Sequence, residues 1–546
     1  MPKNNTNFIF VIGGVMSGIG KGITVASTAR ILKDYGFKAT AVKIDPYLNV
    51  DAGTMNPTEH GEVFVTEDGM ECDQDIGNYE RFLDQNILKD NYMTSGAVYR
   101  EVINRERDLG YNGKCVQIIP HITDEIESRL INVANKNKAD FVLVEIGGTA
   151  GEYENLLFLE TARIMKLKMP GRILFMLVSY LPIPEKLGEM KTKPTQHAVR
   201  ALNYAGIQPD IIIARSSRSL DQIRKKKISL FCNVVPEDVI SAPDIDSIYE
   251  VPVNFEKDNL GKIILKKFGL KPKKNNFSEW QNLVKKIKAA KKIVKIGIVG
   301  KYFGIGDFTL ADSYISVIEA IKHAAWHLNL KPEIHWLDAQ SFEENSKKLN
   351  ELKNYHGIIV PGGFGSRGVE GKILTIEYVR KHKIPYLGLC YGMQLAVIEF
   401  SRNVCGLHKA HTTEVNPKTP YPVISTLPEQ TQRILNHKDL GGTMRLGAYV
   451  CELNINSKAF ELYKSKLITE RHRHRYEFNN EYRDILEKKG MIFSGINPDR
   501  NLVEIIELKN HPYFIGTQFH PEFKSRPLHP HPLFLGLVCA AKNRII

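Results

Sequence analysis

The sequence lacks the features that mark secreted, membrane-spanning and zinc-binding proteins. Its seven cysteines are scattered and include no C-x-x-C pair, which argues against a structural zinc site and favours a reducing compartment. No apolar run is long enough to cross a bilayer, and the first five residues show no signal peptide. We therefore expect a soluble, cytoplasmic protein with no membrane partner.

A recognisable nucleic-acid-binding module is also missing, although the net charge is +13. The lysines lie mostly in scattered runs, and a basic chain would equally suit small anionic substrates. We therefore predict no nucleic-acid partner. A non-enzymatic filament or nucleic-acid scaffold is the alternative that the charge would also fit. At 546 residues, with 43% hydrophobic and 25% charged residues, the chain should form two or more globular domains.

The glycine-rich stretch Gly13–Thr24 lies between an apolar run typical of a buried parallel strand and a segment with helical periodicity that ends at Gly36. Such a bend aims backbone N–H groups and a helix N-terminus at an anion, with Lys21 as a point charge for phosphates. It is not a standard P-loop, because Gly22 stands where that motif has a Ser or Thr and the spacing from Gly14 is one residue longer. A plain glycine turn is the alternative, but a lysine buried at a helix start needs an anionic partner.

The missing hydroxyl means that a metal ion would need other ligands. Asp75, in an acidic loop, and Glu145, at the end of an apolar strand, can supply the oxygen ligands that Mg²⁺ prefers. An Asp in such a loop is, taken alone, more often simply solvated. Lys43 also ends a strand, where open α/β sheets bind ligands. The Lys191–His197 run concentrates cations and hydroxyls before a helix and predicts either a second polyphosphate site or a surface lysine cluster.

A second α/β region follows a lysine-rich segment over 271–292, which is typical of a linker with a short amphipathic helix. In that region Cys390 lies where a strand turns sharply into a helix, the geometry of a nucleophile elbow. The run Pro361–Gly365 can offer backbone N–H groups to an oxyanion. A strand ending in His520, with Glu522 two residues later, predicts a base and the carboxylate that orients it.

Several of these motifs resemble a known family. GGVMSGIGKG, HGEVFVTEDG, KTKPTQH and Lys227–Asn233 resemble the synthetase (amidoligase) domain of the CTP synthase family, and the Cys390 and His520 motifs resemble a class I glutamine amidotransferase. The resemblance covers nearly the whole chain and implies an α/β fold. It implies a P-loop-like, parallel-sheet amidoligase domain over 1–270, the linker over 271–292 and an α/β class I glutamine amidotransferase domain over 293–546.

The resemblance also implies ligands for individual residues. ATP would contact Gly18, Ile19, Gly20, Lys21, Gly22, Ile23, Lys43, Asp75, Arg215, Asp244 and Ile245, and Asp75 and Glu145 would hold Mg²⁺. UTP or CTP would contact Ser17, Glu152, Tyr153, Glu154, Lys191, Thr192, Lys193, Pro194, Thr195, Gln196 and Lys227. Glutamine would contact Gly363, Tyr391, Gly392, Met393, Gln394, Glu414 and Arg475, with Cys390, His520 and Glu522 catalytic. Tyr391 departs from the Leu expected after the nucleophile.

The activity implied is ATP-dependent amination of UTP to CTP with ammonia from L-glutamine, through a 4-phosphorylated UTP. GTP would activate, CTP would inhibit, and members form homotetramers that can stack into filaments. His60 and Val63 would line the ammonia passage, and Gly365–Gly371 and Leu440–Gly447 would belong to a lid that answers GTP; the segment 303–310 is insertion-like. The alternative is another amidoligase of the same domain pairing, such as the cobyric acid synthase type, against which KTKPTQH and HGEVFVTEDG weigh.

Overall fold

Contacts within the chain divide it into two compact units. The computed structural model describes residues 5–55, 61–186, 188–300, 311–363, 366–426 and 444–545. The first unit comprises Met1–Ala52 and Asp75–Val284, and the second comprises Gly53–Gln74 and Lys285–Ile546. Over these described ranges, no helix is both long and apolar enough to span a membrane.

The first unit is built on a seven-stranded sheet in the order β5-β2-β6-β1-β7-β8-β9, in which every neighbouring pair is parallel. Because parallel strands end at one edge, the loops that follow β1, β2 and β6 gather there. The strands are β1 (Asn7–Gly13), β2 (Ala39–Asp45), β5 (Tyr92–Thr94), β6 (Phe141–Ile146), β7 (Ile173–Tyr180), β8 (Ile211–Ser216) and β9 (Val239–Pro243). The predicted parallel-sheet domain is confirmed.

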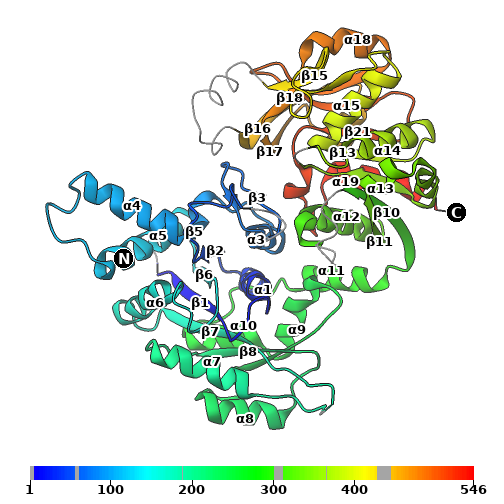
Figure 1. Ribbon diagram of the computed structural model, residues 1–546. Coiled ribbons are helices and arrows are strands. Elements are labelled where there is room, and N and C mark those ends of the chain that lie inside the picture. Colours follow the sequence, from blue (N-terminus) through cyan, green and yellow to red (C-terminus); the bar gives the residue numbers. More distant parts are fainter. Residues whose placement is uncertain are drawn as a thin grey trace. The chain divides into compact units, whose positions relative to one another are not determined.

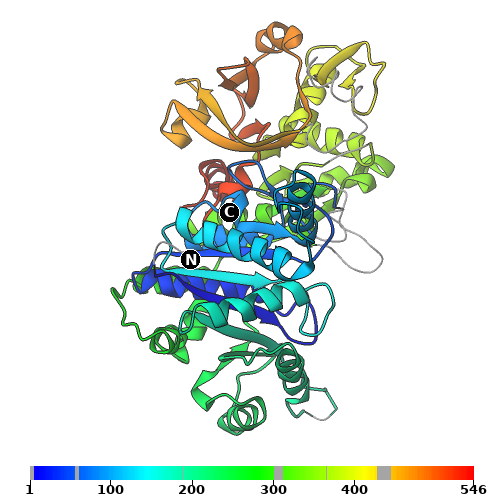
Figure 2. The same ribbon diagram turned by 90° about the vertical axis from the view of Figure 1, so that its left-hand side faces the viewer.

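Helices cover both faces of this sheet (Figures 1 and 2). Alternate residues of β1 point to opposite faces, and Phe8, Phe10 and Ile12 share one core cluster with residues of α4 to α8. Helices α3, α9 and α10 pack against α1. The helices are α1 (Lys21–Asp34), α3 (Asp75–Leu83), α4 (Ser95–Arg107), α5 (Thr123–Lys136), α6 (Leu156–Lys168), α7 (Lys193–Tyr204), α8 (Gln222–Cys232), α9 (Val251–Lys257) and α10 (Leu260–Lys267).

The second unit has a nine-stranded sheet in the order β11-β10-β12-β13-β21-β20-β19-β16-β17. The strands from β11 to β21 in this order pair in parallel, and those from β21 to β17 pair antiparallel. They are β10 (Lys292–Gly300), β11 (Leu330–Asp338), β12 (Gly357–Val360), β13 (Tyr386–Leu389), β16 (Arg445–Leu453), β17 (Leu467–His474), β19 (Met491–Asn497), β20 (Leu502–Leu508) and β21 (Phe514–Thr517).

A smaller sheet and a set of helices complete the second unit. The small sheet contains β14 (Ala410–Thr412), β15 (Tyr421–Thr426) and β18 (Tyr476–Phe478). The helices are α12 (Ile315–His327), α13 (Ala339–Glu344), α14 (Val369–Lys381), α15 (Tyr391–Asn403), α17 (Lys458–Tyr463), α18 (Arg483–Lys488) and α19 (Pro532–Lys542). The α/β architecture predicted for this region is confirmed.

The segment 53–74 belongs to the second unit although the sequence resemblance assigns it to the first domain. It contains the hairpin of β3 (Phe64–Val65) and β4 (Glu71–Cys72). Arg471 of β17 donates to the Glu67 carboxylate at 2.9 Å and to the main-chain oxygen of Val65 at 3.1 Å. Arg473 donates to Glu71 at 2.8 Å. Ion pairs to β17 therefore hold this segment in the second unit.

The predicted linker contains the expected amphipathic helix, α11 (Ser278–Ala289). Its buried Trp280 packs against Phe82 and Tyr249 and donates from Nε1 to the main-chain oxygen of Tyr249 at 2.8 Å. Arg30 lies over the Trp280 ring. The first half of α11 is thus packed into the first unit. The domain limits at 270 and 293 stay predictions.

Candidate active sites of the two units

Helix α1 begins directly at the glycine-rich stretch. Gly18 and Gly20 have φ values of 70° and 85°, which favour glycine, and Gly20 is the N-cap of α1. Lys21 donates from Nζ to the main-chain oxygen of Gly148 at 2.7 Å. Burial lowers the pKa of Lys21, and the nearby Glu145 carboxylate opposes that shift. The predicted bend is present, and its lysine is folded against the loop that follows β6.

Three charged side chains meet where β2 and β6 end. Lys43 Nζ lies 2.6 Å from Asp75 Oδ2 and 2.8 Å from Glu145 Oε1. Tyr79 donates to the second oxygen of Glu145. Burial raises the pKa of Glu145, the charge of Asp75 raises it further, and Lys43 opposes both. The structure therefore brings the two predicted metal ligands together, with the Lys43 ammonium against both of them.

Gly22 is what allows Asp75 to approach α1. A Cβ at Gly22 would lie 2.0 Å from Asp75 Oδ1 and 2.4 Å from Asp75 Cγ, so the carboxylate fills the space beside the position of the missing P-loop hydroxyl. The described residues include no group of three or more His, Cys, Asp or Glu that could hold a metal ion. Mg²⁺ is nevertheless commonly bound by one or two carboxylates together with substrate phosphates. Asp75 and Glu145 therefore fit a magnesium ion that is bound together with a nucleotide.

A pocket of about 270 Å³ opens beside the start of α1. It brings together Gly20 and Ile23 with the three residues expected to border adenine, Arg215, Asp244 and Ile245. Arg215 donates to the Asp244 carboxylate at 2.9 Å. The rest of its wall is largely apolar and includes no residue that the sequence predicts for the site: Thr24, Ala242, Pro243, Ile248, Val251, Asn254 and Phe255.

The residues expected to bind UTP or CTP lie on several segments of the first unit. Lys191 forms an ion pair with Glu189 at 2.6 Å. The hydrogen bond from Lys191 lowers the pKa of Glu189, and the charge of Lys227 adds to that shift. Ser17, Tyr153, Glu154, Lys193 and Lys227 are exposed, Lys191, Pro194 and Glu152 are half-buried, and Thr192, Thr195 and Gln196 are buried.

Several of these residues are held by contacts within the unit. Glu152 accepts hydrogen bonds from the backbone N–H and the hydroxyl of Thr149, and Thr195 shares a hydrogen bond with Ser179 at the end of β7. The Gln196 Oε1 atom is buried and has no hydrogen-bond partner in the described part of the chain. Nucleotide binding by this set stays a prediction.

Cys390 occupies the sharp turn that the sequence predicts. It is the N-cap residue between β13 and α15, with φ 49° and ψ −100°, a backbone conformation that a residue with a Cβ rarely adopts. Its N–H donates to the main-chain oxygen of Thr517 at 2.6 Å. Because β13 and β21 are neighbouring parallel strands, the residues that follow each strand meet at one edge of the sheet.

His520 and Glu522 follow β21 and complete this arrangement. His520 Nδ1 lies 2.7 Å from Glu522 Oε1, while the buried His520 Nε2 has no hydrogen-bond partner within the described ranges. A Cβ at Gly362 would lie 3.7 Å from Cys390 Cβ and 3.9 Å from His520 Nε2, so both side chains border one space. Burial alone would lower the pKa of His520, but Glu522 and the Cys390 sulfur raise it to about 10.

This space is part of a pocket of about 280 Å³. Cys390, His520 and Glu522 line it together with Gly363 and Arg475. Burial raises the pKa of Tyr476, the Glu414 carboxylate adds to that shift, and Arg475 opposes it, so both predicted glutamine ligands lie near Tyr476. Tyr391, Gly392, Met393 and Gln394 are buried at the start of α15. The Gln394 amide donates to the main-chain oxygen of Tyr476 and is not among the pocket-lining residues.

The pocket also contains residues that sequence reasoning missed. These are Gly53, Met55 and Glu62, which line it from the segment 53–74 together with Val63, the residue expected in the ammonia passage. Glu62 accepts hydrogen bonds from the backbone N–H and the hydroxyl of Ser316. A loop this long inside a compact domain is usually functional, and its length is the one signal that could have found these residues. His60, the 303–310 segment, Gly365 and residues 440–443 lie outside the described residues, so the expectations placed on them stay untested.

Comparisons with known proteins match both halves of the chain to known families. The family model described as "CTP synthase N-terminus" matches residues 7–270, and that of "Glutamine amidotransferase class-I" matches residues 309–540. A CTP synthase of Pyrococcus abyssi (strain GE5 / Orsay) is 53% identical over 541 residues, 98% of each chain. One of Caldanaerobacter subterraneus subsp. tengcongensis is 51% identical over 539 residues, again 98% of each.

Among solved structures, the glutaminase domain of Trypanosoma brucei CTPS with bound acivicin is 36% identical. It matches 46% of this chain and 94% of its own with a TM-score of 0.42. Both family models and the full-length relatives lead to one conclusion: the chain belongs to the CTP synthase family of glutamine-hydrolysing ligases, enzymes that form a C–N bond.

Proposed function

We propose that this enzyme converts UTP to CTP, using ATP and ammonia that it releases from L-glutamine, in the cytoplasm. The observation that carries the proposal is the presence in one chain of a cysteine–histidine–glutamate pocket and of a lysine–carboxylate cluster at a phosphate-type loop. The first is suited to acyl transfer and the second to phosphoryl transfer.

In the second unit, Cys390 attacks the side-chain carboxamide of glutamine. His520 accepts the thiol proton and returns it to the departing nitrogen, which leaves as ammonia, while Glu522 holds the imidazole in position. The backbone N–H groups of Gly363 and Tyr391 stabilise the oxyanion. Water then hydrolyses the thioester to glutamate and restores the thiol. Glu414 and Arg475 bind the α-amino and α-carboxylate groups of glutamine, since a guanidinium suits a carboxylate.

In the first unit, the γ-phosphoryl group of ATP passes to O4 of the UTP uracil ring, giving ADP and 4-phosphorylated UTP. Ammonia attacks C4, phosphate leaves, and CTP forms. The residues Gly18 to Ile23 hold the ATP phosphates, and Lys21 and Lys43 neutralise their charge. Arg215, Asp244 and Ile245 border the adenine, a role supported by their shared pocket with Gly20 and Ile23.

Asp75 and Glu145 would hold Mg²⁺, which supplies charge neutralisation on the phosphates when it is bound. The Lys43 ammonium now contacts both carboxylates. It would move toward a phosphate when Asp75 and Glu145 bind the metal ion. The pyrimidine nucleotide would contact Ser17, Glu152–Glu154, Lys191–Gln196 and Lys227. CTP would inhibit through the same phosphate subsite, and GTP would activate glutamine hydrolysis.

We further propose that ammonia reaches the first unit through an internal passage, which keeps it neutral and out of bulk water. His60 and Val63 would line that passage, and Val63 also lines the Cys390 pocket. The assembly would be a homotetramer that can form filaments, and neither a nucleic acid nor a membrane would be a partner.

The experiment that tests this function is a substrate panel. The purified enzyme is incubated with ATP, Mg²⁺ and glutamine plus either UTP, a corrin acid or a dicarboxylic acid, and nucleotide products are separated. We expect CTP from UTP and no amidation of the other acids. Amidation of a corrin acid without CTP would support the cobyric acid synthase type, which the names of the full-length relatives do not favour.

A further inference from the structure

Gln518 contacts the sulfur of the proposed nucleophile. Its Nε2 atom lies 3.7 Å from Cys390 Sγ, and its side chain is completely buried. It is not among the residues that line the glutamine pocket. Gln518 follows β21 directly, and the last residue of that strand, Thr517, accepts the hydrogen bond from the Cys390 N–H. The amide therefore reaches the sulfur from the interior of the unit.

The orientation of the Gln518 amide follows from its neighbours. Gln394 donates from Nε2 to the main-chain oxygen of Tyr476 at 2.9 Å and to Gln518 Oε1 at 3.3 Å. A main-chain oxygen can only accept, so the Gln394 atom that faces it must be the NH₂ group. The second N–H of that group needs an acceptor, which must be Oε1 of Gln518. This leaves the Gln518 NH₂ group facing the sulfur.

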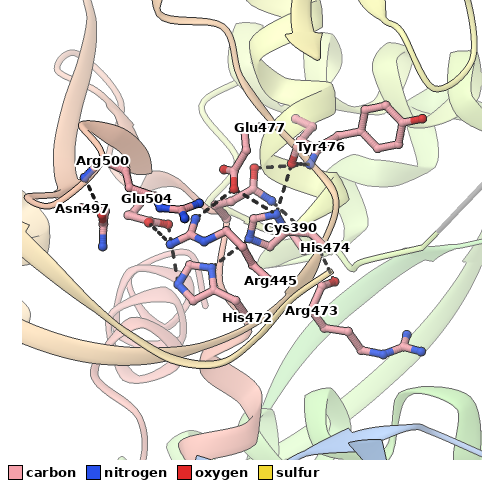
Figure 3. Close-up of polar contacts among 12 residues, drawn as sticks. Cys390, Arg445, His472, Arg473, His474, Tyr476, Glu477, Asn497, Arg500 and Glu504 are labelled. Carbon is pink, nitrogen blue, oxygen red and sulfur yellow. Dashed lines mark hydrogen bonds and ion pairs between the residues drawn. The ribbon is translucent and has the colours of Figure 1, made fainter. Parts of the chain in front are cut away.

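The Tyr476 carbonyl is itself fixed by a buried polar cluster, defined here as Arg445, His472, His474, Glu477 and Glu504 (Figure 3). His474 donates from Nδ1 to the Tyr476 oxygen at 3.2 Å, and its Nε2 lies 2.9 Å from His472 Nδ1. Arg445 joins Glu477 and Glu504, at 2.9 Å each. The five side chains are at most 3% exposed, so the carbonyl that orients Gln394 has little freedom to move.

Two polar neighbours of the sulfur favour different protonation states of Cys390. The main-chain oxygen of Arg473 lies 4.0 Å from Sγ and can interact favourably only with an S–H group. The Gln518 N–H can only donate, so it favours the thiolate. We propose that Gln518 stabilises the Cys390 thiolate by an N–H···S hydrogen bond, with Gln394 as the positioning residue that aims it. This inference rests on the proposed role of Cys390 as the nucleophile.

The charged groups that border the same space are His520 and Glu522 after β21, Arg473 and Arg475 at the end of β17, and Glu62 from the segment 53–74. Replacing Gln518 changes none of these five residues. A change in thiolate formation can therefore be assigned to the lost amide.

The test measures thiolate formation directly. The full-length enzyme is treated with chloroacetamide from pH 5.5 to 9.5, and mass spectrometry follows alkylation of the peptide that contains Cys390. The exposed Cys115 serves as a reference thiol in the same sample. For Gln518→Met, we expect the alkylation midpoint at Cys390 to rise by about one to two pH units. Glutamine-dependent kcat should fall about 10- to 100-fold at neutral pH, with little change in KM for glutamine.

Two further variants separate this role from packing. Gln518→Glu keeps the shape but replaces the donor by an acceptor, and we expect a larger shift in the same direction. Gln394→Met removes the group that aims Gln518, together with its hydrogen bond to the Tyr476 oxygen, and leaves the Gln518 amide in place, so we expect a smaller shift. Gln340→Met, on α13 and away from the pocket, is the matched control and should behave like wild type. CTP formation from ammonium salts should persist in every variant and reports that the fold is intact.

The outcomes distinguish this inference from the proposed function. Unchanged alkylation profiles in Gln518→Met and Gln518→Glu would overturn the thiolate role of Gln518. If Gln518→Met does not fold, an unshifted profile in Gln394→Met would do so. If Cys390→Ala retains glutamine-dependent CTP formation, the proposed nucleophile itself is wrong, whatever the Gln518 variants show.

Discussion

At the scale of single residues, the absence of a side chain at Gly22 is as informative as the charged groups around it. Sequence comparison with a P-loop marks Gly22 only as a departure from the motif. In the folded chain, the carboxylate of Asp75 lies where a Gly22 Cβ would be. One position thus explains both why the hydroxyl is missing and which group takes its place.

Substituting Gly22 by Ala should displace Asp75, because the new Cβ would be 2.0 Å from Oδ1. We expect CTP formation to fall about 10- to 100-fold with glutamine and with ammonium salts alike, since misplacing a reacting group by about 1 Å costs that much. Ser128→Ala, at an exposed position of α5, is the control. Equal activity of Gly22→Ala and wild type would contradict the proposed metal-binding role of Asp75.

Glu477 carries a residue-scale prediction about pH. Burial raises the pKa of its carboxyl to about 8; Arg445 opposes the shift and Glu504 adds to it. In the unfolded chain the same carboxyl has its ordinary pKa of 4.5. Between these values the folded protein holds a proton that the unfolded chain has released, so raising the pH lowers the free energy of unfolding.

Glu477→Gln removes this titration and keeps an oxygen for Arg445. We expect the loss of stability between pH 5.5 and 7.5 to become shallower by up to about 1.4 kcal/mol per pH unit, as measured by denaturant unfolding at both pH values. Glu461→Gln, at an exposed position of α17, controls for the loss of one carboxylate. Parallel pH dependence in wild type and Glu477→Gln would show that Glu477 is ionised in the folded protein.

At the scale of elements, β17 shows how one strand serves two purposes. Successive side chains of a strand point to opposite faces. Arg471 and Arg473 hold the β3–β4 hairpin through Glu67 and Glu71. His472 and His474, between and beyond them, belong to the buried cluster behind Cys390. In the sequence, only one residue next to this strand, Arg475, has a predicted role.

The β3–β4 hairpin should be needed for the glutaminase site. Phe64 is fully buried, and its ring centroid lies 5.0 Å from that of Phe523, which in turn stacks on His520 at 5.1 Å. Phe64→Ala should destabilise the second unit by about 3–5 kcal/mol and reduce glutamine hydrolysis through loss of the support behind His520.

Thermal unfolding and glutamine hydrolysis of Phe64→Ala would be compared with those of Val15→Ala, an exposed position. A stable Phe64→Ala variant with a full rate of glutamine hydrolysis would mean that the hairpin is not needed for the glutaminase site.

The elements that sequence could predict are those with a local signal. Gly13–Thr24 combines an apolar strand with a glycine bend, and Cys390 has a strand before it and a helix after it, so both turns were predictable. The location of the segment 53–74 could not be predicted, because its ion pairs join residues about 400 positions apart, such as Arg471 with Glu67. The wall of the pocket beside α1 was missed for the same reason: Ile248 and Phe255 have no motif of their own.

At the scale of the whole molecule, the chain holds two chemically distinct sites in two units. Lys21, Lys43, Asp75 and Glu145 lie in the first unit, and Cys390, His520 and Glu522 lie in the second. The central claim of the proposed function is that nitrogen released at Cys390 is consumed at the nucleotide site of the first unit.

One measurement tests that claim most directly: the rate of CTP formation by Cys390→Ala and by Lys21→Ala, each with glutamine and with ammonium chloride as the nitrogen source. We predict that Cys390→Ala makes no CTP from glutamine but makes it from ammonium chloride at nearly the wild-type rate, because only the thiol is lost. Lys21→Ala should fail with both sources. Loss of both activities in Cys390→Ala, or normal use of ammonium chloride by Lys21→Ala, would contradict the division of labour between the two units.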